Sequence, residues 1–221
     1  MKIGGFLKFS ILDYPGKLSC VVFCQGCSLR CVYCHNPEFL PYEKDNCVDF
    51  QGFLSFLQSH SGSLDAVVFS GGEPLLQDDL FQVIELVKGF GFLVGIHTSG
   101  IVTEMFERIV SLVDWIGFDV KTVFSKYDTI TKMSNSGMIA KKSLELLLNS
   151  GTSYEIRTTY DSRFISNDDI FEIAKILQKL GVKEWVIQKC IIRETGEELT
   201  LLDKEVVDGL SEFTAIKLRG L

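Results

Sequence analysis

The chain has 221 residues, of which 46% are hydrophobic and 23% charged, and its formal net charge is −7. These values are typical of a folded protein, and the acidic excess disfavours nucleic acid and anionic membranes as partners, because both attract basic patches. Apolar runs are too short to span a membrane. Lys8, Asp13 and Pro15 interrupt any signal-peptide core, so we expect a cytoplasmic protein.

The length fits one domain, and no repeat, low-complexity tract or linker marks a second one. We therefore expect a single domain over residues 1–221, with an irregular lead-in over 1–16 and a C-terminal extension over 193–221 that contains a helix. The seven cysteines, in a chain without a secretion signal, are interpreted as reduced thiols and ligands.

Short apolar strands alternate with helices along the chain. Strands are predicted over 18–23, 65–69, 92–96, 115–120, 154–158 and 185–191. Helices are predicted over 48–58, 80–89, 102–112, 139–148, 169–180 and 203–213, with a looser stretch over 123–137. This alternation favours parallel strands joined by right-handed crossovers. Six strand–helix units are too few for the closed eight-stranded barrel, so we predict an open (β/α)6 partial barrel of parallel strands.

The loop after the first strand contains three closely spaced cysteines. Cys27, Cys31 and Cys34 follow the spacing C-x3-C-x2-C within CQGCSLRCVYCHNP. Thiols so close in sequence cannot pair with one another as structural disulfides, but they can turn inward around a soft metal centre. An iron–sulfur cluster of four irons held by three thiolates leaves one iron open to a non-protein ligand. An open iron suggests chemistry rather than electron storage.

Two other interpretations of these cysteines were weighed. Zinc could be held by the same three cysteines with Cys24, although two zinc knuckles usually lie about 15–20 residues apart. A ferredoxin would carry the run C-x2-C-x2-C-x3-C-P, in which the gaps come in a different order. Cys20 and Cys190 lie in apolar strands, where cysteine acts as a small hydrophobe. Cys24 is ambiguous and is interpreted as packing only because it falls outside the three-cysteine motif.

Polar residues follow several strands at their carboxyl ends, where parallel α/β proteins place their sites. Gly71-Gly72-Glu73-Pro74 follows the second strand, Thr98-Ser99-Gly100 the third, and Asp119-Val120-Lys121 the fourth. Taken alone, the first of these is most simply a turn that caps the next helix. Asp119 and Lys121 share one side of their strand, and such a pair costs desolvation unless it meets a partner. A zwitterionic ligand is one such partner, and exposure to solvent beyond the strand is the alternative.

These features together resemble the radical S-adenosylmethionine (SAM) superfamily. Its C-x3-C-x-aromatic-C signature matches residues 27–34, and its GGEP motif matches residues 71–74. The resemblance implies that Cys27, Cys31 and Cys34 hold a [4Fe–4S] cluster, and that SAM chelates the fourth iron through its amino and carboxylate groups.

The same resemblance suggests contacts for SAM. Tyr33 would lie beside the adenine, and Glu73 with nearby backbone carbonyls would receive the SAM ammonium. Lys121 is a candidate for the SAM carboxylate, Asp119 for a ribose hydroxyl or a cation, and Arg157 for a carboxylate or the ribose. The full set of expected cofactor contacts is Tyr33, Gly71, Gly72, Glu73, Pro74, Thr98, Asp119, Lys121 and Arg157.

Within the superfamily the chain is most similar to glycyl-radical-enzyme activases, and among them to the activating protein of anaerobic ribonucleoside-triphosphate reductase. The segments KFSILDYPGK, FCQGCSLRCVYCHNP, SGGEP and FDVK carry this likeness, which covers about residues 3–192. One departure is His97, where activases often have an acidic residue. The likeness therefore does not extend to the monovalent cation that some relatives bind there.

The resemblance implies that the reduced cluster passes one electron to the SAM sulfonium and yields methionine and a 5′-deoxyadenosyl radical. That radical would remove an α-hydrogen from a glycine of the partner enzyme. A flavodoxin or ferredoxin is the expected electron donor. Asp13 and Tyr14 are candidates for contact with the glycine loop, although they could form an ordinary turn.

Three alternatives stay open. A pyruvate formate-lyase-type activase differs only in its partner. A small-molecule radical SAM enzyme, such as a deazapurine-forming synthase, would need polar residues for a second ligand, and none stand out beyond the SAM set. An electron-transfer or zinc-binding module would leave the polar strand ends without a purpose.

Overall fold

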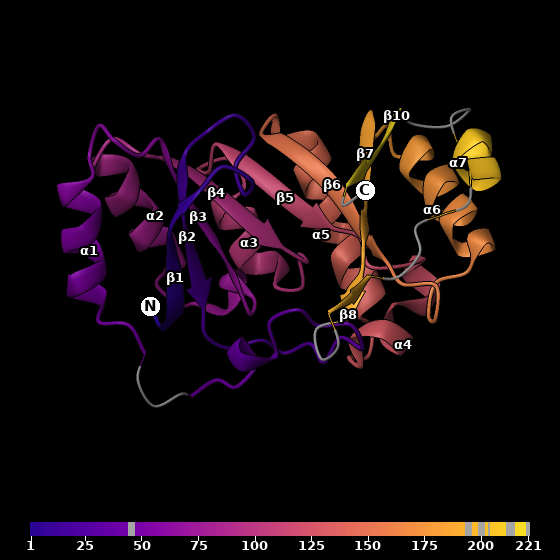
Figure 1. The fold of residues 1–221 in the computed structure, drawn as a ribbon, viewed down its shortest axis with the longest axis horizontal. Helices are drawn as coiled ribbons and strands as arrows, with labels where there is room; N and C mark the ends of the chain where they lie inside the picture. The colour runs from indigo at the N-terminus through magenta and orange to yellow at the C-terminus, as the bar shows by residue number, and fades with distance from the viewer. Residues whose placement is uncertain (44–46, 193–195, 199–201, 203, 211–214, 220–221) are drawn as a thin grey trace.

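The computed structural model describes residues 1–43, 47–192, 196–198, 202, 204–210 and 215–219. Within this part of the chain the main sheet has eight strands, in the order β1-β2-β3-β4-β5-β6-β7-β10 (Figure 1). Their bounds are β1 Ile3–Ser10, β2 Ser19–Cys24, β3 Ala66–Gly71, β4 Leu93–Thr98, β5 Trp115–Asp119, β6 Ser153–Tyr160, β7 Glu184–Lys189 and β10 Ala215–Arg219. Strands β2 to β10 of this sheet are parallel, and β1 is antiparallel to β2.

The helices follow the strands in alternation. The α-helices are α1 Phe50–Ser59, α2 Leu80–Gly89, α3 Thr103–Ile109, α4 Tyr127–Thr131, α5 Ser136–Ser150, α6 Asn167–Lys179 and α7 Lys204–Leu210. Short 3-10 turns are η1 Pro37–Phe39, η2 Pro74–Leu76 and η3 Phe124–Lys126, and β8 Ile191–Ile192 pairs with β9 Glu197–Glu198. The predicted open α/β sheet with six parallel strand–helix units is confirmed.

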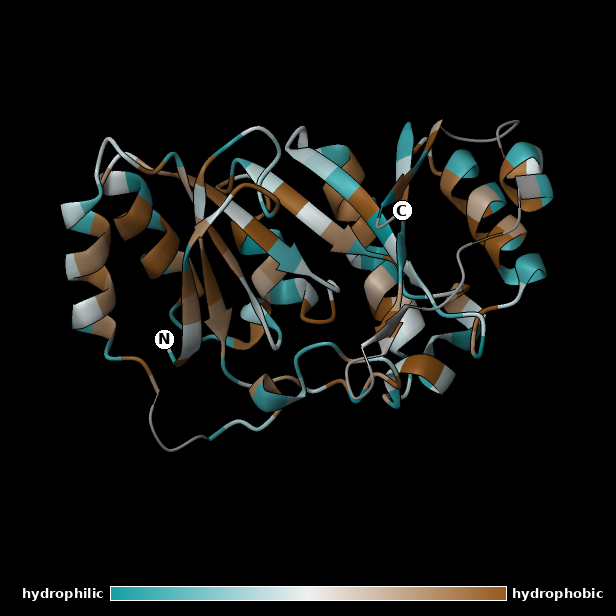
Figure 2. Ribbon diagram, in the orientation of Figure 1, coloured by the Kyte–Doolittle hydropathy of each residue, from teal (hydrophilic) through white to brown (hydrophobic). Residues whose placement is uncertain are grey.

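The core lies between the helices and one face of the sheet. Phe69 of β3, Ile96 of β4 and Phe118 of β5 are fully buried there, together with Phe53 of α1 and Phe106 of α3. Because neighbouring residues of a strand point to opposite faces, the residues between them face the other side of the sheet. Figure 2 shows this alternation as brown and pale or teal bands along the strands. The second face carries many small or polar residues, and the site is built on it.

The predicted irregular lead-in is wrong over much of its length, because residues 3–10 form the edge strand β1. Gly4 and Gly5 have low strand propensity, so the sequence pattern did not indicate this strand. The structure shows why glycine is needed at position 4: a Cβ there would lie 2.5 Å from Gln25 Oε1 and 2.6 Å from Phe39 Cδ1, too close for a side chain.

The C-terminal part and the looser stretch also differ from expectation. The helix predicted over 203–213 is present as α7, and its remaining residues lie outside the described part. The strand β10, which pairs in parallel with β7, was not predicted. The stretch 123–137 contains α4, which ends at Thr131. The next residue, Lys132, has the left-handed backbone conformation. Within the described residues, no helix is long and apolar enough to cross a membrane.

Trp185 offers a test of the packing between β6 and β7. Its side chain is fully buried, and its indole N–H donates to Thr158 Oγ1 at 2.9 Å. We expect Trp185→Ala to lower the free energy of unfolding by about 3–5 kcal/mol, since it removes a large buried ring. Trp185→Phe should cost much less. Urea unfolding of the metal-free protein measures both, and equal midpoints for the two variants would contradict this packing.

Candidate active site

One pocket of about 390 Å³ lies at the carboxyl ends of the parallel strands, between the sheet and the cysteine loop. Most of the predicted site residues line it: Asp13, Cys27, Cys31, Tyr33, Cys34, Gly71, Gly72, Glu73, Thr98, Asp119, Lys121 and Arg157. Tyr14 and Pro74 do not. Pro74 is buried at the start of η2, and Tyr14 packs beneath the pocket against Trp115.

The cysteine loop is held from two sides by backbone hydrogen bonds. Cys27 N donates to Leu40 O at 3.1 Å within the loop itself. On the other side, Arg30 N donates to Thr131 O at the end of α4, at 2.8 Å. The Tyr33 hydroxyl donates to Lys121 O at 3.0 Å and ties the loop to the end of β5. The predicted ligand loop is therefore shaped by elements that lie about 100 residues away in sequence.

The thiols fit a cluster bound by three cysteines. Cys27, Cys31 and Cys34 line the pocket together, whereas Cys24 is fully buried within β2 and does not reach it. Burial raises the pKa of the Cys27 thiol to about 12 and also raises that of Cys31. No group of three or more His, Cys, Asp or Glu residues in the described part is arranged around a single metal ion. A cubane cluster places each thiolate on a different iron, so it suits three pocket-lining thiols without a fourth.

Gly71 and Gly72 are required by the backbone of the cysteine loop. Gly71 has φ +102°, and a Cβ on Gly72 would lie 2.3 Å from Gly26 O. In addition, Gly72 N donates to Cys24 O and Glu73 N to Gly26 O, both at 2.9 Å. The glycines therefore let the end of β3 pack directly on the loop. A role in ligand approach, which the sequence suggested, is not needed to explain them.

The Glu73 carboxylate is buried and fully hydrogen-bonded. Its Oε1 accepts from Thr98 Oγ1 at 2.5 Å and from Leu75 N at 3.3 Å. Its Oε2 accepts from Ser99 N at 3.0 Å and Ser99 Oγ at 2.6 Å. Burial raises the pKa of Glu73, and the Ser99 and Thr98 donors oppose this shift. The carboxylate thus links the ends of β3 and β4, and its acceptor capacity is taken up by the protein.

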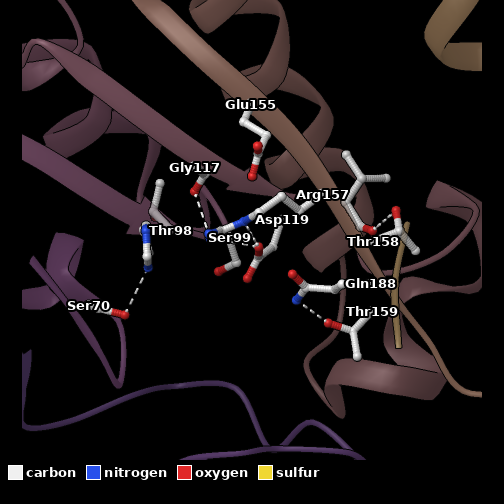
Figure 3. Close-up of polar contacts among 12 residues, drawn as sticks. Ser70, Thr98, Ser99, Gly117, Asp119, Glu155, Arg157, Thr158, Thr159 and Gln188 are labelled. Carbon is white, nitrogen blue, oxygen red and sulfur yellow. Dashed lines mark hydrogen bonds and ion pairs between the residues drawn. The ribbon is translucent and has the colours of Figure 1, made fainter. Parts of the chain in front are cut away.

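Asp119 at the end of β5, Lys121 just beyond it and Arg157 of β6 form a charged group. Figure 3 shows the contact between Asp119 and Arg157. Asp119 is the register partner of Arg157, whose Nε lies 3.1 Å from Asp119 Oδ1 and whose Nη2 donates to Gly117 O at 3.3 Å. The guanidinium occupies the space that a side chain at Gly117 would need. Among the described residues, Lys121 Nζ makes one long contact, 3.5 Å to Asp119 Oδ2. Two cations and one carboxylate leave the group with one net positive charge.

The charges of this group are stable over a wide pH range. Burial alone would raise the pKa of Asp119, but Arg157 and Lys121 outweigh it and the pKa is lowered. Burial would lower the pKa of Lys121, yet Asp119 holds it well above its ordinary value. Tyr127 fixes the backbone here, because its hydroxyl accepts from Lys121 N at 2.9 Å and donates to Asp119 O at 3.3 Å.

Other features of the site add to the predicted residues. His97 acts through Asp13, 84 positions away, and no local pattern reveals such a contact. Thr159, Gln188 and Arg219 line the far wall, beyond Arg157. Gln188 Nε2 donates to Thr159 Oγ1 at 2.7 Å (Figure 3). These residues lie beyond the expected SAM set, and they are half-buried or exposed rather than buried.

Replacing Glu73 tests its role in joining the two strand ends. Glu73→Gln places an amide N–H₂ against donors of Thr98 or Ser99, so buried donors lose their acceptor. We expect a loss of about 1–3 kcal/mol in the free energy of unfolding. Glu145→Gln is the matched control, since Glu145 is half-exposed in an i,i+4 pair with Lys141 and should change stability by less than about 0.5 kcal/mol. Equal effects of the two variants would rule out this role.

His97 should make the protein sensitive to acid. Burial first, and then the Arg157 charge, lower its pKa to about 3 from 6.5. The unfolded chain therefore takes up this proton below about pH 6.5 while the folded chain does not, so stability is lost as the pH falls toward 3. Between pH 7 and pH 5 the wild-type protein should lose about 2 kcal/mol more than His97→Gln. Urea unfolding at both pH values measures this difference, and parallel losses would contradict it.

The comparisons with known proteins agree with this geometry. The family model of the radical SAM superfamily matches residues 21–200. A Methanocaldococcus jannaschii protein, provisionally assigned as a glycyl-radical enzyme activating enzyme, is 34% identical over 80% of this chain and 75% of its own length. The pyruvate formate-lyase-activating enzyme of Clostridium pasteurianum is 35% identical over 55% of this chain, which spans only about half of that relative (53%).

Among solved structures, Streptococcus suis SuiB bound to S-adenosylmethionine superposes with a TM-score of 0.69. It covers 90% of this chain and 50% of its own, at 14% identity, and so supports the fold alone. Radical SAM proteins use a [4Fe–4S] cluster and SAM, and the three cysteines that line the pocket fit that cluster. The chain is an enzyme that belongs to the radical SAM superfamily and, within it, to the family of glycyl-radical-enzyme activating enzymes.

Proposed function

We propose that this chain generates a glycyl radical on anaerobic ribonucleoside-triphosphate reductase. The observation that carries an activase function is that three cysteines and the Asp119–Lys121–Arg157 group line one pocket. The lead-in KFSILDYPGK and the QGC…YCHNP loop favour the reductase as the partner, through their likeness to its activating protein. A flavodoxin or ferredoxin is the proposed electron donor.

Cys27, Cys31 and Cys34 would hold the cluster and leave one iron to SAM. When bound, the reduced cluster and SAM together supply a 5′-deoxyadenosyl radical. Tyr33, in the same loop, lines the pocket beside Cys31 and Cys34, where it can support the adenine. Its hydroxyl is bonded to Lys121 O, which holds the ring in a single orientation.

Lys121 is the best candidate for the SAM carboxylate. Its ammonium has one long contact and retains donors for an anion, whereas the Arg157 guanidinium is buried against Asp119 and Gly117 O. Arg157 is therefore proposed to hold Asp119 in place rather than to bind SAM. Asp119, held on one side by Arg157, keeps acceptor capacity on Oδ2 for a ribose hydroxyl.

The SAM ammonium is assigned to backbone carbonyls near Gly71 and Gly72. The Glu73 carboxylate already accepts four hydrogen bonds, so it would act on the ammonium through its charge. Thr98 donates to Glu73 and supports the same arrangement. Glu73 and Thr98 thus contribute to SAM binding by setting the shape and potential of the pocket, with direct contact left to the main chain.

Two other targets compete with the reductase. The likeness to pyruvate formate-lyase-activating enzymes favours that lyase as an alternative partner. The polar far wall formed by Thr159, Gln188 and Arg219 favours a small-molecule substrate, although the same groups could bind a peptide backbone.

The test is anaerobic reconstitution with iron and sulfide, followed by electron paramagnetic resonance of the reduced protein with and without SAM. We expect a [4Fe–4S]⁺ signal that SAM alters, with release of 5′-deoxyadenosine. Cys27→Ser, Cys31→Ser and Cys34→Ser should each abolish both results, because each would remove a cluster ligand. Cys24→Ser is the matched control and should retain them, since Cys24 lies outside the pocket.

The target is identified with purified reductase and lyase that contain glycine deuterated at Cα. The true partner should acquire an organic radical and pass deuterium to 5′-deoxyadenosine. A cluster whose electron paramagnetic resonance signal does not change when SAM is added would overturn the activase function. Deuterium transfer from the lyase alone would replace the proposed target, and SAM cleavage without radical on either protein would favour a small-molecule substrate.

A further inference from the structure

The segment between β1 and β2, residues 11–18, borders the pocket and is called the rim loop here. Leu12 and Asp13 of this loop line the pocket together with the cluster cysteines. Ile11 and Leu12 are 74% and 84% exposed, the two highest values among the exposed large hydrophobic residues of the described chain. A loop with apolar side chains in solvent needs another source of order, and the structure provides two anchors for it.

The first anchor is Tyr14, whose side chain is 8% exposed. Its ring packs on Trp115 with centroids 5.5 Å apart. Gly95 of β4 makes room for it, because a Cβ there would lie 3.0 Å from Tyr14 Cδ2. Tyr14, a predicted substrate contact, is largely buried and supports the rim loop through this packing.

The second anchor is His97, at the pocket-facing end of β4. Its Nε2 lies 3.0 Å from Asp13 O, and its Nδ1 lies 3.3 Å from Ser70 Oγ. A carbonyl oxygen only accepts, so Nε2 carries the proton and Nδ1 accepts from the Ser70 hydroxyl. The edge of the ring also packs against Trp115, with centroids 5.5 Å apart. Both nitrogens of His97 are therefore used within the protein, although the residue lines the pocket.

The Asp13 side chain is held in place as well as its main chain. Ser10 Oγ donates to Asp13 Oδ2 at 2.5 Å, and Leu12 N donates to Ser10 Oγ at 3.1 Å. Asp13 Oδ1 is 4.0 Å from His97 Nδ1, beyond hydrogen-bond distance, and has no donor among the described residues. One oxygen of the carboxylate is thus fixed by Ser10 at the end of β1, and the other is available to a ligand at the rim of the pocket.

We propose that His97 is a positioning residue for the protein substrate. By holding the main chain of Asp13, it presents the second carboxylate oxygen to a backbone N–H of the polypeptide segment that carries the target glycine. Ile11 and Leu12 then contact apolar side chains of that segment. The inference rests on the proposed function only in taking the substrate to be a polypeptide. In this proposal His97 contacts neither substrate nor SAM, because both of its ring nitrogens are hydrogen-bonded within the protein.

The test compares His97→Leu, which removes both hydrogen bonds, with His97→Gln, whose amide can donate to Asp13 O and accept from Ser70. His60→Leu is the matched control, since His60 lies at the end of α1, where its Nδ1 contacts Phe56 O, and it does not line the pocket. Two activities are measured in the reconstituted protein. They are 5′-deoxyadenosine release without a partner, and radical formation over a range of reductase and lyase concentrations.

His97→Leu should raise the partner concentration for half-maximal activation about tenfold, since Asp13 is no longer held in position to contact the partner. SAM cleavage without partner should stay within about twofold of wild type, because SAM is not contacted. His97→Gln should restore most of the partner affinity. Unchanged half-saturation in His97→Leu, or an equal loss of SAM cleavage, would overturn the proposal.

Hydrogen exchange of the rim loop gives a readout that needs no partner. The amides of Leu12 and Lys17, bonded to Ser10 Oγ and Tyr14 O, should exchange faster in His97→Leu than in wild type and His97→Gln. Unchanged exchange would also overturn the proposal. If wild type cleaves SAM but activates neither partner, the proposed function fails, while this exchange measurement still decides whether His97 holds the loop.

Discussion

The buried Glu73 carboxylate is the interaction on which the site depends. Its side chain collects donors from Thr98 and Ser99 at the end of β4, and its own N–H bonds to Gly26 O in the cysteine loop. One residue therefore connects two strand ends with the segment that carries the ligand thiols. An unpaired carboxylate at this depth would be costly, so the network has to form as a whole or not at all.

The pocket separates two kinds of charge. Glu73 is enclosed by uncharged donors, whereas Asp119 is balanced by Arg157 and by the more accessible Lys121. This arrangement places a negative region beside Gly72 and a positive one beside the end of β5. A zwitterion such as the amino-acid part of SAM, which the proposed function places here, would match both regions.

Sequence patterns predicted what depends on local order. The parallel strands, the grouping of Cys27, Cys31 and Cys34, and the pairing of Asp119 with Lys121 followed from periodicity and spacing. The patterns failed where a residue acts through a distant partner. His97 contacts Asp13 across 84 positions, and Gly4 belongs to a strand despite its low propensity. Propensity measures the local backbone, and these features are set by packing.

The two outer strands of the main sheet, β1 and β10, stand at opposite ends of the strand order and do not pair with each other. The sheet consequently encloses its contents on one side only. A closed barrel would seal a reactive species by itself, whereas an open sheet leaves that task to whatever docks at its mouth. Protection of a radical from solvent and from stray reaction is then a property of the complex, and the partner acts both as reactant and as the missing wall.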